Sequence, residues 1–358
     1  MPDFPWDVLA PYAARARAHP DGAVDLSVGA PADPTPQVVR DALAAASDAP
    51  AYPPPAGTAA LSEAVAGYLA RRAGTGPLPP SAVLPTIGSK ELIALLPTLL
   101  GLGPGDRVVL PELAYPTYDV GARLAGAESV RSDGLAGLGP ARVGLVWVNS
   151  PSNPTGRVLP PEHLRKVVAW ARERGAVLAS DECYLDFGWE EHPHSILHAD
   201  VCAGSHEGLL AVHSLSKRSN LAGYRAGFLA GDPALVAALL AVRKHAGLMV
   251  PWPVQAAMVA ALSDDAHVEE QRARYAGRRA DLRAALERAG FAVDHSTAGL
   301  YLWATRGEDC WSTVDALASR GILVAPGSFY GEGGARHVRV ALTATDERVA
   351  AAVARLSS

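Results

Sequence analysis

The chain alternates two patterns of apolar and polar positions over most of its length. Short runs are rich in β-branched and aliphatic residues, which suit buried strands, and the longer stretches between them repeat apolar residues with a helical period. Strands that alternate with helices are typical of a mostly parallel sheet covered on both faces, so we predict an α/β fold. The predicted strands are 83–87, 107–110, 143–148, 177–180, 209–213 and 226–230, and the predicted helices are 90–100, 117–125, 161–174 and 234–246.

The pattern changes near residue 264. A long polar helix at 266–289 is followed by shorter elements: strands at 300–304, 322–325 and 337–342, and helices at 311–320 and from Asp346. The first forty residues are rich in proline, hold one strand-like run at 24–28, and are expected to fold back onto this terminal part or onto a partner subunit. We therefore predict an N-terminal arm that is also part of a small domain (1–40), a large domain (41–263) and a small α+β domain (264–358).

Composition narrows the class of protein. Apolar residues make up 49% of the 358 residues, which predicts a packed core, and the net charge of −5 does not favour nucleic acid as a partner. The longest apolar run, 92–102, is far too short to span a bilayer. The three cysteines form no Cys-x-x-Cys pair, and the N-terminus lacks the features of a signal peptide. We therefore predict a soluble protein of the reducing cytoplasm with no membrane contact.

Lysine is scarce, so a reactive amine has few candidates. Lys217 follows the strand 209–213 within Ser214-Leu215-Ser216-Lys217, at the kind of strand end where open α/β sheets bind ligands. A lone lysine is usually solvated, but Ser214 and Arg225 supply hydroxyl and guanidinium donors of the kind that bind a phosphate. The four lysines of the chain are Lys90, Lys166, Lys217 and Lys244.

Polar side chains also follow two neighbouring strands. Asp181 ends the run 177–180, with Tyr184 three residues later, and Asn153 follows the strand 143–148. Alone, an aspartate there often forms a turn, and Asn-Pro-Thr-Gly is a common turn sequence. Because the carboxyl ends of parallel strands meet at one edge, the three together predict a site.

A second signal lies where the strand 83–87 passes into a helix through Gly88, Ser89 and Lys90. Free backbone N–H groups at a helix start form an anion site, although an ordinary glycine turn is an equally good interpretation of this segment alone.

These residues together supply one amine, one carboxylate, a phenol, an amide and several phosphate donors. Pyridoxal phosphate requires these groups. Their ordered motifs resemble the class I and II aminotransferases of fold type I. That resemblance implies pyridoxal 5'-phosphate as cofactor, and a large domain whose mostly parallel seven-stranded sheet lies between helices, with a smaller α+β domain. The motifs are Tyr-Pro-x-Tyr at 115–118, Asn-Pro-Thr-Gly at 153–156, Asp-Glu-x-Tyr at 181–184, Ser-x-Ser-Lys at 214–217 and the late Arg339.

The resemblance also implies a role for each residue around the cofactor ring. Lys217 would form the Schiff base and move the proton between the substrate Cα and the cofactor. Asp181 would pair with the ring nitrogen, Asn153 and Tyr184 would bind the 3-oxygen, and Tyr115 would stack on the ring.

The phosphate and substrate sites follow from the same resemblance. Gly88, Ser89 and Lys90, the last two through backbone N–H groups, would hold the phosphate together with Ser214 and Arg225, and Tyr52 would reach it from the partner subunit, which implies a homodimer with the active site at its interface. Arg339 would bind the substrate α-carboxylate beside Gly29 and Asn153.

At a finer level the chain resembles the actinobacterial succinyldiaminopimelate aminotransferases, in segments such as 4–7, 112–119, 243–247 and 341–348. This implies glutamate and 2-oxoglutarate as one substrate pair, N-succinyl-2-amino-6-oxopimelate or its amine as the other, and a place in diaminopimelate and lysine biosynthesis. The extra carboxylates of such a substrate call for further cations. Arg218 and Lys244 are candidates, although Arg218 could instead face a structural carboxylate.

Other interpretations remain at this stage. The same cofactor serves aminotransferases for aromatic, branched-chain or aspartate-type substrates and carbon–sulfur lyases. A cofactor-sensing transcription regulator would need a winged helix before a pattern that already begins within the first sixty residues, and a non-catalytic binding protein would not require the four site residues together. His192, His194 and His198 could suggest a metal, but loop histidines without a spaced acid are usually surface residues, so we predict no metal site.

Overall fold

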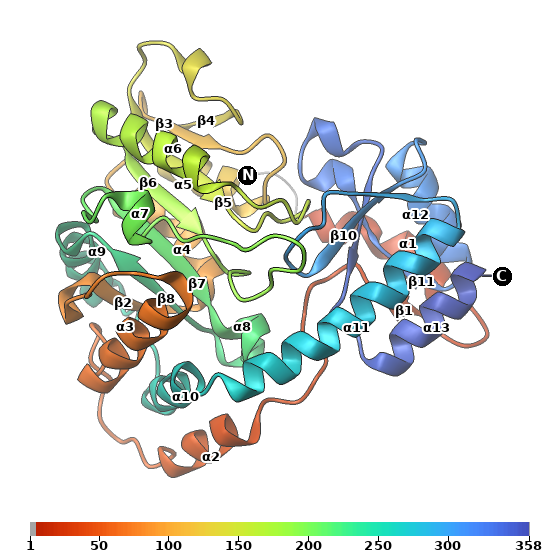
Figure 1. Ribbon diagram of the computed structural model, residues 1–358, viewed down its shortest axis with the longest axis horizontal. Helices are drawn as coiled ribbons and strands as arrows, with labels where there is room; N and C mark the ends of the chain where they lie inside the picture. Colours follow the sequence, from red (N-terminus) through yellow and green to blue (C-terminus); the bar gives the residue numbers. More distant parts are fainter. Residues whose placement is uncertain (1–4, 358) are drawn as a thin grey trace.

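The computed structural model describes residues 5–357 and is built around a seven-stranded sheet (Figure 1). Every neighbouring pair is parallel except the two made by β8, which runs antiparallel to both of its neighbours. The α/β fold class with a mostly parallel seven-stranded sheet is therefore confirmed. In spatial order the strands are β2 (Val83–Ile87), β8 (Ala226–Gly231), β7 (Leu209–Ser214), β6 (Val177–Asp181), β5 (Val143–Asn149), β3 (Arg107–Leu110) and β4 (Glu128–Arg131).

Both faces of this sheet are buried, which explains its continuous apolar runs. Successive side chains of a strand point to opposite faces, so Val146 and Val148 of β5 belong to one core cluster, whereas Leu145 and Trp147 belong to the other. The first cluster includes residues of α2 (Gln37–Ala45), α3 (Ala59–Ala73), α6 (Pro161–Arg174) and α10 (Trp252–Ser263), and the second includes residues of α4 (Gly88–Leu99), α5 (Thr117–Ala125) and α9 (Pro233–Ala246).

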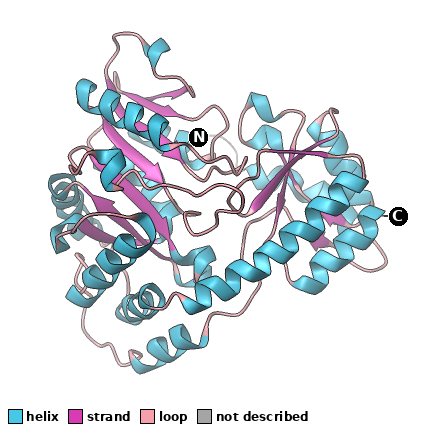
Figure 2. Ribbon diagram, in the orientation of Figure 1, coloured by secondary structure: helices cyan, strands magenta, loops and turns pink. Residues whose placement is uncertain are grey.

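A second group of strands lies apart from the large sheet (Figure 2). The expected single strand at 322–325 is wrong, because β11 pairs with β1 and β12 joins the four-stranded sheet instead. A short apolar run does not reveal which neighbour each of its residues will pair with. The four-stranded sheet has the order β12 (Ala325–Pro326), β13 (Val338–Ala341), β10 (Tyr301–Thr305) and β9 (Ala292–Asp294), and the separate pair is β1 (Val24–Asp25) with β11 (Ile322–Leu323).

The long helix α11 (Ala266–Arg288) runs from the large sheet to this second group, which also holds α1 (Ala10–Arg17), α12 (Cys310–Ser319) and α13 (Asp346–Ser357) (Figure 1). Arg278 of α11 donates two hydrogen bonds, of 2.7 and 2.6 Å, to the carboxylate of Asp33, and a third of 2.6 Å to Asp346. These bonds and the β1–β11 pairing fasten the N-terminal segment to the C-terminal part. The boundaries at residues 40 and 263 stay a prediction, and residues 1–4 of the expected arm lie outside the described residues.

Among the described residues, no helix combines the length and the apolar character that crossing a membrane would need.

Candidate active site

A pocket of about 450 Å³ lies between the large sheet and the second group of strands. The large sheet supplies side chains from the ends of β5, β6 and β7, and β10 and β13 supply others. Most of the predicted site residues line this pocket, namely Gly29, Ser89, Lys90, Tyr115, Asn153, Asp181, Tyr184, Lys217, Arg225 and Arg339. Gly88, Ser214 and Tyr52 do not line it.

Lys217 is presented by a single helical turn, α8 (Leu215–Arg218), directly after β7. The Ser214 hydroxyl accepts a hydrogen bond of 3.1 Å from the Ser216 backbone N–H and thereby caps the turn. Ser214 is buried, so the structure gives its side chain a local role and leaves the expected phosphate contact a prediction. Of the other lysines, Lys166 and Lys244 lie exposed on α6 and α9, and Lys90 alone joins Lys217 in the pocket.

Asp181 is held by donors on both carboxylate oxygens. The Tyr118 hydroxyl donates to its Oδ2 at 2.7 Å, and the Cys183 backbone N–H donates to its Oδ1 at 3.2 Å. Burial, followed by the nearby Asp181 charge, raises the pKa of Tyr118 well above its usual value, so the phenol stays protonated and donates. Tyr118 also stacks on Trp147 with ring centroids 4.9 Å apart. Tyr118 is the second tyrosine of the Tyr-Pro-x-Tyr motif at 115–118, and no role was predicted for it.

Arg339 on β13 is buried, with only 2% of its surface exposed. Its Nη1 donates to Oδ1 of Asn153 at 2.8 Å, and its Nη2 donates to the carbonyl of Ser27 at 2.7 Å. Its Nε–H has no hydrogen-bond partner among the described residues. Arg339 is thus buried and paired, and its role as the carboxylate-binding residue stays a prediction.

Two tyrosines meet beside this guanidinium. The hydroxyls of Tyr184 and Tyr301 lie 3.0 Å apart, and the Tyr301 ring centroid lies 3.9 Å from the guanidinium carbon of Arg339. A Cβ on Gly29 would lie 2.1 Å from the Tyr301 hydroxyl, so any larger residue there would force the Tyr301 side chain to shift. Tyr301 and Cys183, which also line the pocket, were not predicted as site residues.

The start of α4 and the side chain of Arg225 form a cationic corner of the pocket. Gly88 has a left-handed φ of 70°, and a Cβ on it would lie 2.3 Å from Nη2 of Arg225. Partial burial and the charge of Arg225 lower the pKa of Lys90, which lines the same pocket. A helix N-terminus, a guanidinium and an ammonium form a donor set that suits a phosphate monoester. Together with Lys217 and Asp181, which line the same pocket, these residues fit pyridoxal phosphate.

Tyr52 lies in the segment before α3 and is 89% exposed, apart from the pocket of its own chain. An aromatic side chain this exposed is the kind of residue that contacts another molecule, so its expected role across a subunit interface stays a prediction.

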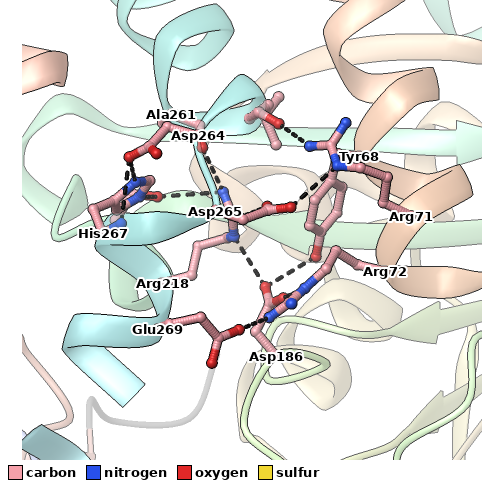
Figure 3. Close-up of polar contacts among 12 residues, drawn as sticks. Tyr68, Arg71, Arg72, Asp186, Arg218, Ala261, Asp264, Asp265, His267 and Glu269 are labelled. Atoms are coloured by element: carbon pink, nitrogen blue, oxygen red, sulfur yellow. Dashed lines mark hydrogen bonds and ion pairs between the residues drawn. The ribbon is translucent and has the colours of Figure 1, made fainter. Parts of the chain in front are cut away.

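Arg218 is turned toward a structural carboxylate, not into the pocket (Figure 3). Its Nε donates to Oδ2 of Asp186 at 2.9 Å, and both side chains are buried. Asp186 also accepts hydrogen bonds from the Tyr68 hydroxyl at 3.0 Å and from Nε of Arg72 at 2.9 Å. The expectation of Arg218 as a pocket cation is therefore wrong, because this buried carboxylate already holds the guanidinium. Lys244 does not line the pocket either.

The three loop histidines contact one another only by their ring edges. The centroids of His192 and His194 are 5.4 Å apart, and those of His194 and His198 are 5.9 Å apart. No cluster of three or more His, Cys, Asp or Glu side chains suited to a metal ion occurs within residues 5–357.

Comparisons with known proteins identify the family of this chain. The family model for aminotransferase class I and II matches residues 21–356. The chain is 66% identical to 4-dedimethylamino-4-oxo-anhydrotetracycline transaminase OxyQ of Streptomyces rimosus, over all of this chain and 99% of the relative. It is 68% identical to a probable aminotransferase of Mycobacterium tuberculosis, over all of this chain and 85% of the relative. A solved structure of a probable N-succinyldiaminopimelate aminotransferase from Thermus thermophilus has a TM-score of 0.87 at 31% identity and covers 99% of each chain.

These matches extend over nearly the whole chain. The chain therefore belongs to the class I and II aminotransferases, fold type I enzymes that use pyridoxal 5'-phosphate to transfer amino groups between amino acids and 2-oxo acids.

Proposed function

We propose that this aminotransferase acts on N-succinyl-LL-2,6-diaminopimelate. The amino group passes to 2-oxoglutarate and gives N-succinyl-2-amino-6-oxopimelate and glutamate, a step of diaminopimelate and lysine biosynthesis in the cytoplasm. The observation that carries the proposal is the match to the Thermus thermophilus structure over 99% of each chain.

The cofactor, when bound, supplies an electron sink for negative charge at the substrate Cα. Lys217 holds the amine that attaches the cofactor and then moves the proton at Cα. Asp181, fixed by Tyr118, provides the carboxylate that keeps the ring nitrogen protonated. Arg339 donates a fork of N–H groups to the substrate α-carboxylate and thereby orients Cα toward Lys217.

A succinylated substrate carries carboxylates beyond the one that Arg339 binds. Arg218 is held by Asp186, so it does not serve them. Lys90 and Arg225 lie at the phosphate corner, Lys217 attaches the cofactor and Arg339 binds the α-carboxylate. The described residues that line the pocket therefore offer no further lysine or arginine for a distal carboxylate. Residues from a partner subunit would complete this end of the pocket, since we propose a homodimer in which Tyr52 reaches the partner's phosphate site.

The 66% identity to the Streptomyces rimosus transaminase favours a second candidate function. In that case the amino acceptor would be a ketone on a fused ring system, as the name of the relative indicates. The pocket offers Val28, Ile93 and Trp6 as an apolar and aromatic lining against which such rings would pack.

A half-reaction screen distinguishes these functions. The aminated cofactor is prepared by adding glutamate and removing the product, and single 2-oxo or ketone acceptors are then added while the visible absorbance is followed. We expect N-succinyl-2-amino-6-oxopimelate to restore the absorbance at a rate comparable to that of 2-oxoglutarate. Restoration by 4-dedimethylamino-4-oxo-anhydrotetracycline alone would support the second candidate instead.

The same screen covers the remaining alternatives. Faster reaction with aromatic, branched-chain or aspartate-derived 2-oxo acids would replace the proposed substrate. Release of pyruvate and ammonia from a sulfur-containing amino acid, without formation of glutamate, would indicate a carbon–sulfur lyase.

A further inference from the structure

The hydroxyl of Tyr301 connects two parts of the pocket that the predicted roles treat separately. Tyr301 lies on β10, next to the strand that carries Arg339, whereas Tyr184 follows β6 of the large sheet. Their hydroxyls are 3.0 Å apart, and the Tyr301 ring packs on the Arg339 guanidinium at 3.9 Å. One side chain thus contacts both the residue predicted to bind the α-carboxylate and a residue predicted to bind the cofactor 3-oxygen.

The direction of the hydroxyl–hydroxyl bond follows from chemistry. Tyr184 has one O–H, and if it donates that proton to the 3-oxygen of the cofactor, its own oxygen is left to accept. Tyr301 then has to be the donor in the bond between the two tyrosines. Hydrogen bonds in such a chain polarise one another, so donation by Tyr301 strengthens donation by Tyr184.

The two phenols lie in a buried part of the pocket. Tyr184 and Tyr301 are buried, with 5% and 4% of their surfaces exposed. Burial, followed by the neighbouring Tyr301, raises the pKa of Tyr184 well above its usual value. The other titratable groups around the pair are Arg339, Cys183, Tyr115, Tyr275 and Tyr330.

The position of Tyr301 is tightly defined. A Cβ on Gly29 would lie 2.1 Å from the Tyr301 hydroxyl, so the glycine backbone is packed directly against it. The guanidinium restrains the ring from its face and Gly29 restrains the hydroxyl. The side chain therefore has little freedom to turn its O–H away from Tyr184.

We infer that Tyr301 is a positioning residue of the transamination site: its hydroxyl orients the Tyr184 proton toward the cofactor 3-oxygen, and its ring holds Arg339 in place for the α-carboxylate. The inference rests on the proposed role of Tyr184. It adds to that role a residue that no sequence motif indicated.

The test uses the cofactor-loaded enzyme and the pH titration of its visible absorbance, which reports the proton shared between the lysine-bound nitrogen and the 3-oxygen. A donor to the 3-oxygen stabilises the deprotonated form and lowers the midpoint of this titration. Tyr301→Phe keeps the ring and removes the donor to Tyr184, so we expect the midpoint to rise by roughly half a unit. Tyr184→Phe, which removes the contact itself, should raise it further.

Two other variants separate the functions of the ring and the hydroxyl. Tyr301→Leu should also raise KM for the amino acid about tenfold, because the guanidinium loses its stacking partner, whereas Tyr301→Phe should leave KM within about twofold of wild type. Tyr330→Phe is the matched control for the titration. Its ring lies 5.1 Å from the same guanidinium, and its hydroxyl has no hydrogen-bond partner among the described residues.

The double variant Tyr184→Phe/Tyr301→Phe completes a cycle, and we expect its midpoint to equal that of Tyr184→Phe alone. An unchanged midpoint in Tyr301→Phe, with a shifted one in Tyr184→Phe, would overturn the inference and leave the role of Tyr184 standing. An unchanged midpoint in Tyr184→Phe would remove that role and the inference with it. A shift in Tyr330→Phe equal to that of Tyr301→Phe would show a nonspecific effect near Arg339 and would also overturn the inference.

Discussion

The Tyr118 hydroxyl donates a 2.7 Å hydrogen bond to Oδ2 of Asp181, and both side chains are buried. This bond joins the first turn of α5 to the end of β6 and fixes the carboxylate that we assign to the cofactor ring nitrogen. The carboxylate is thereby oriented before any ligand binds.

Replacing Tyr118 by Phe removes this donor and leaves a buried oxygen of Asp181 without it. We expect kcat to fall about tenfold while the cofactor stays bound, because a charge-assisted hydrogen bond contributes about 1.5–3 kcal/mol.

Asp181→Asn should retain cofactor and lose most of the rate. Steady-state kinetics with a cofactor assay checks both variants, with Tyr12→Phe as a control, and normal turnover in Tyr118→Phe would show that the bond is not needed.

Lys217→Ala should abolish the covalent attachment of the cofactor. Lys90 is the only other described lysine in the pocket, and it lies at the cationic corner beside Arg225. We expect no cofactor to be trapped on the chain by borohydride reduction, as measured by intact mass. Lys166→Ala, on the exposed face of α6, should trap normally, and an adduct retained by Lys217→Ala would disprove the assignment.

Arg339→Lys should reduce kcat/KM about a hundredfold for both the amino donor and 2-oxoglutarate, because lysine keeps the charge but loses the planar fork. The visible absorbance of the bound cofactor should persist. Arg336→Lys, at an exposed position just before β13, provides the matched control. An effect on only one of the two substrates would contradict a shared α-carboxylate site.

The proposed dimer can be tested with two inactive variants. Tyr52→Ala and Lys217→Ala subunits, coexpressed, form mixed dimers in which one of the two sites has both Lys217 and the Tyr52 of the other subunit. If assembly is random, about a quarter of the wild-type activity should return at limiting cofactor. Each variant expressed alone sets the baseline, and activity no higher than that baseline would show that Tyr52 does not act across an interface.

Asp186 should make stability depend on acid pH. Burial alone would raise the pKa of this carboxyl, but Arg218, Arg72 and Tyr68 outweigh that effect and lower it (Figure 3). A carboxyl whose pKa is lower in the folded state stabilises the fold above its unfolded pKa of about 3.9, and this contribution is lost as the pH falls through the folded pKa.

Asp186→Asn should therefore lower the free energy of unfolding by about 3 kcal/mol at pH 7, because both guanidinium groups lose a buried partner. The difference from wild type should shrink below about pH 4. Urea unfolding at several pH values measures this, and Asp315→Asn, which removes an exposed carboxylate elsewhere, serves as the control. A difference that stays constant down to pH 3 would contradict the argument.

The large sheet could be predicted closely because its strands are buried on both faces and therefore carry continuous apolar runs. The edge strand β4 was missed, since Glu128–Arg131 is polar and only its pairing with β3 makes it a strand. The site was visible for a related reason. Lys217, Asp181 and Asn153 each follow a strand, and parallel strands bring their carboxyl ends to one edge.

The fold class, the family resemblance and the residues at strand ends could thus be predicted from the sequence, because these depend on local pattern and on the geometry of βα units. The side chains that support those residues are known only from the folded structure. Tyr118 and Asp181 are 63 residues apart in the sequence. Tyr184 and Tyr301 are 117 residues apart. Arg218 faces Asp186, although its neighbour Lys217 faces the pocket. Such contacts depend on how separate elements pack, and local sequence carries no signal for the partner that packing will supply.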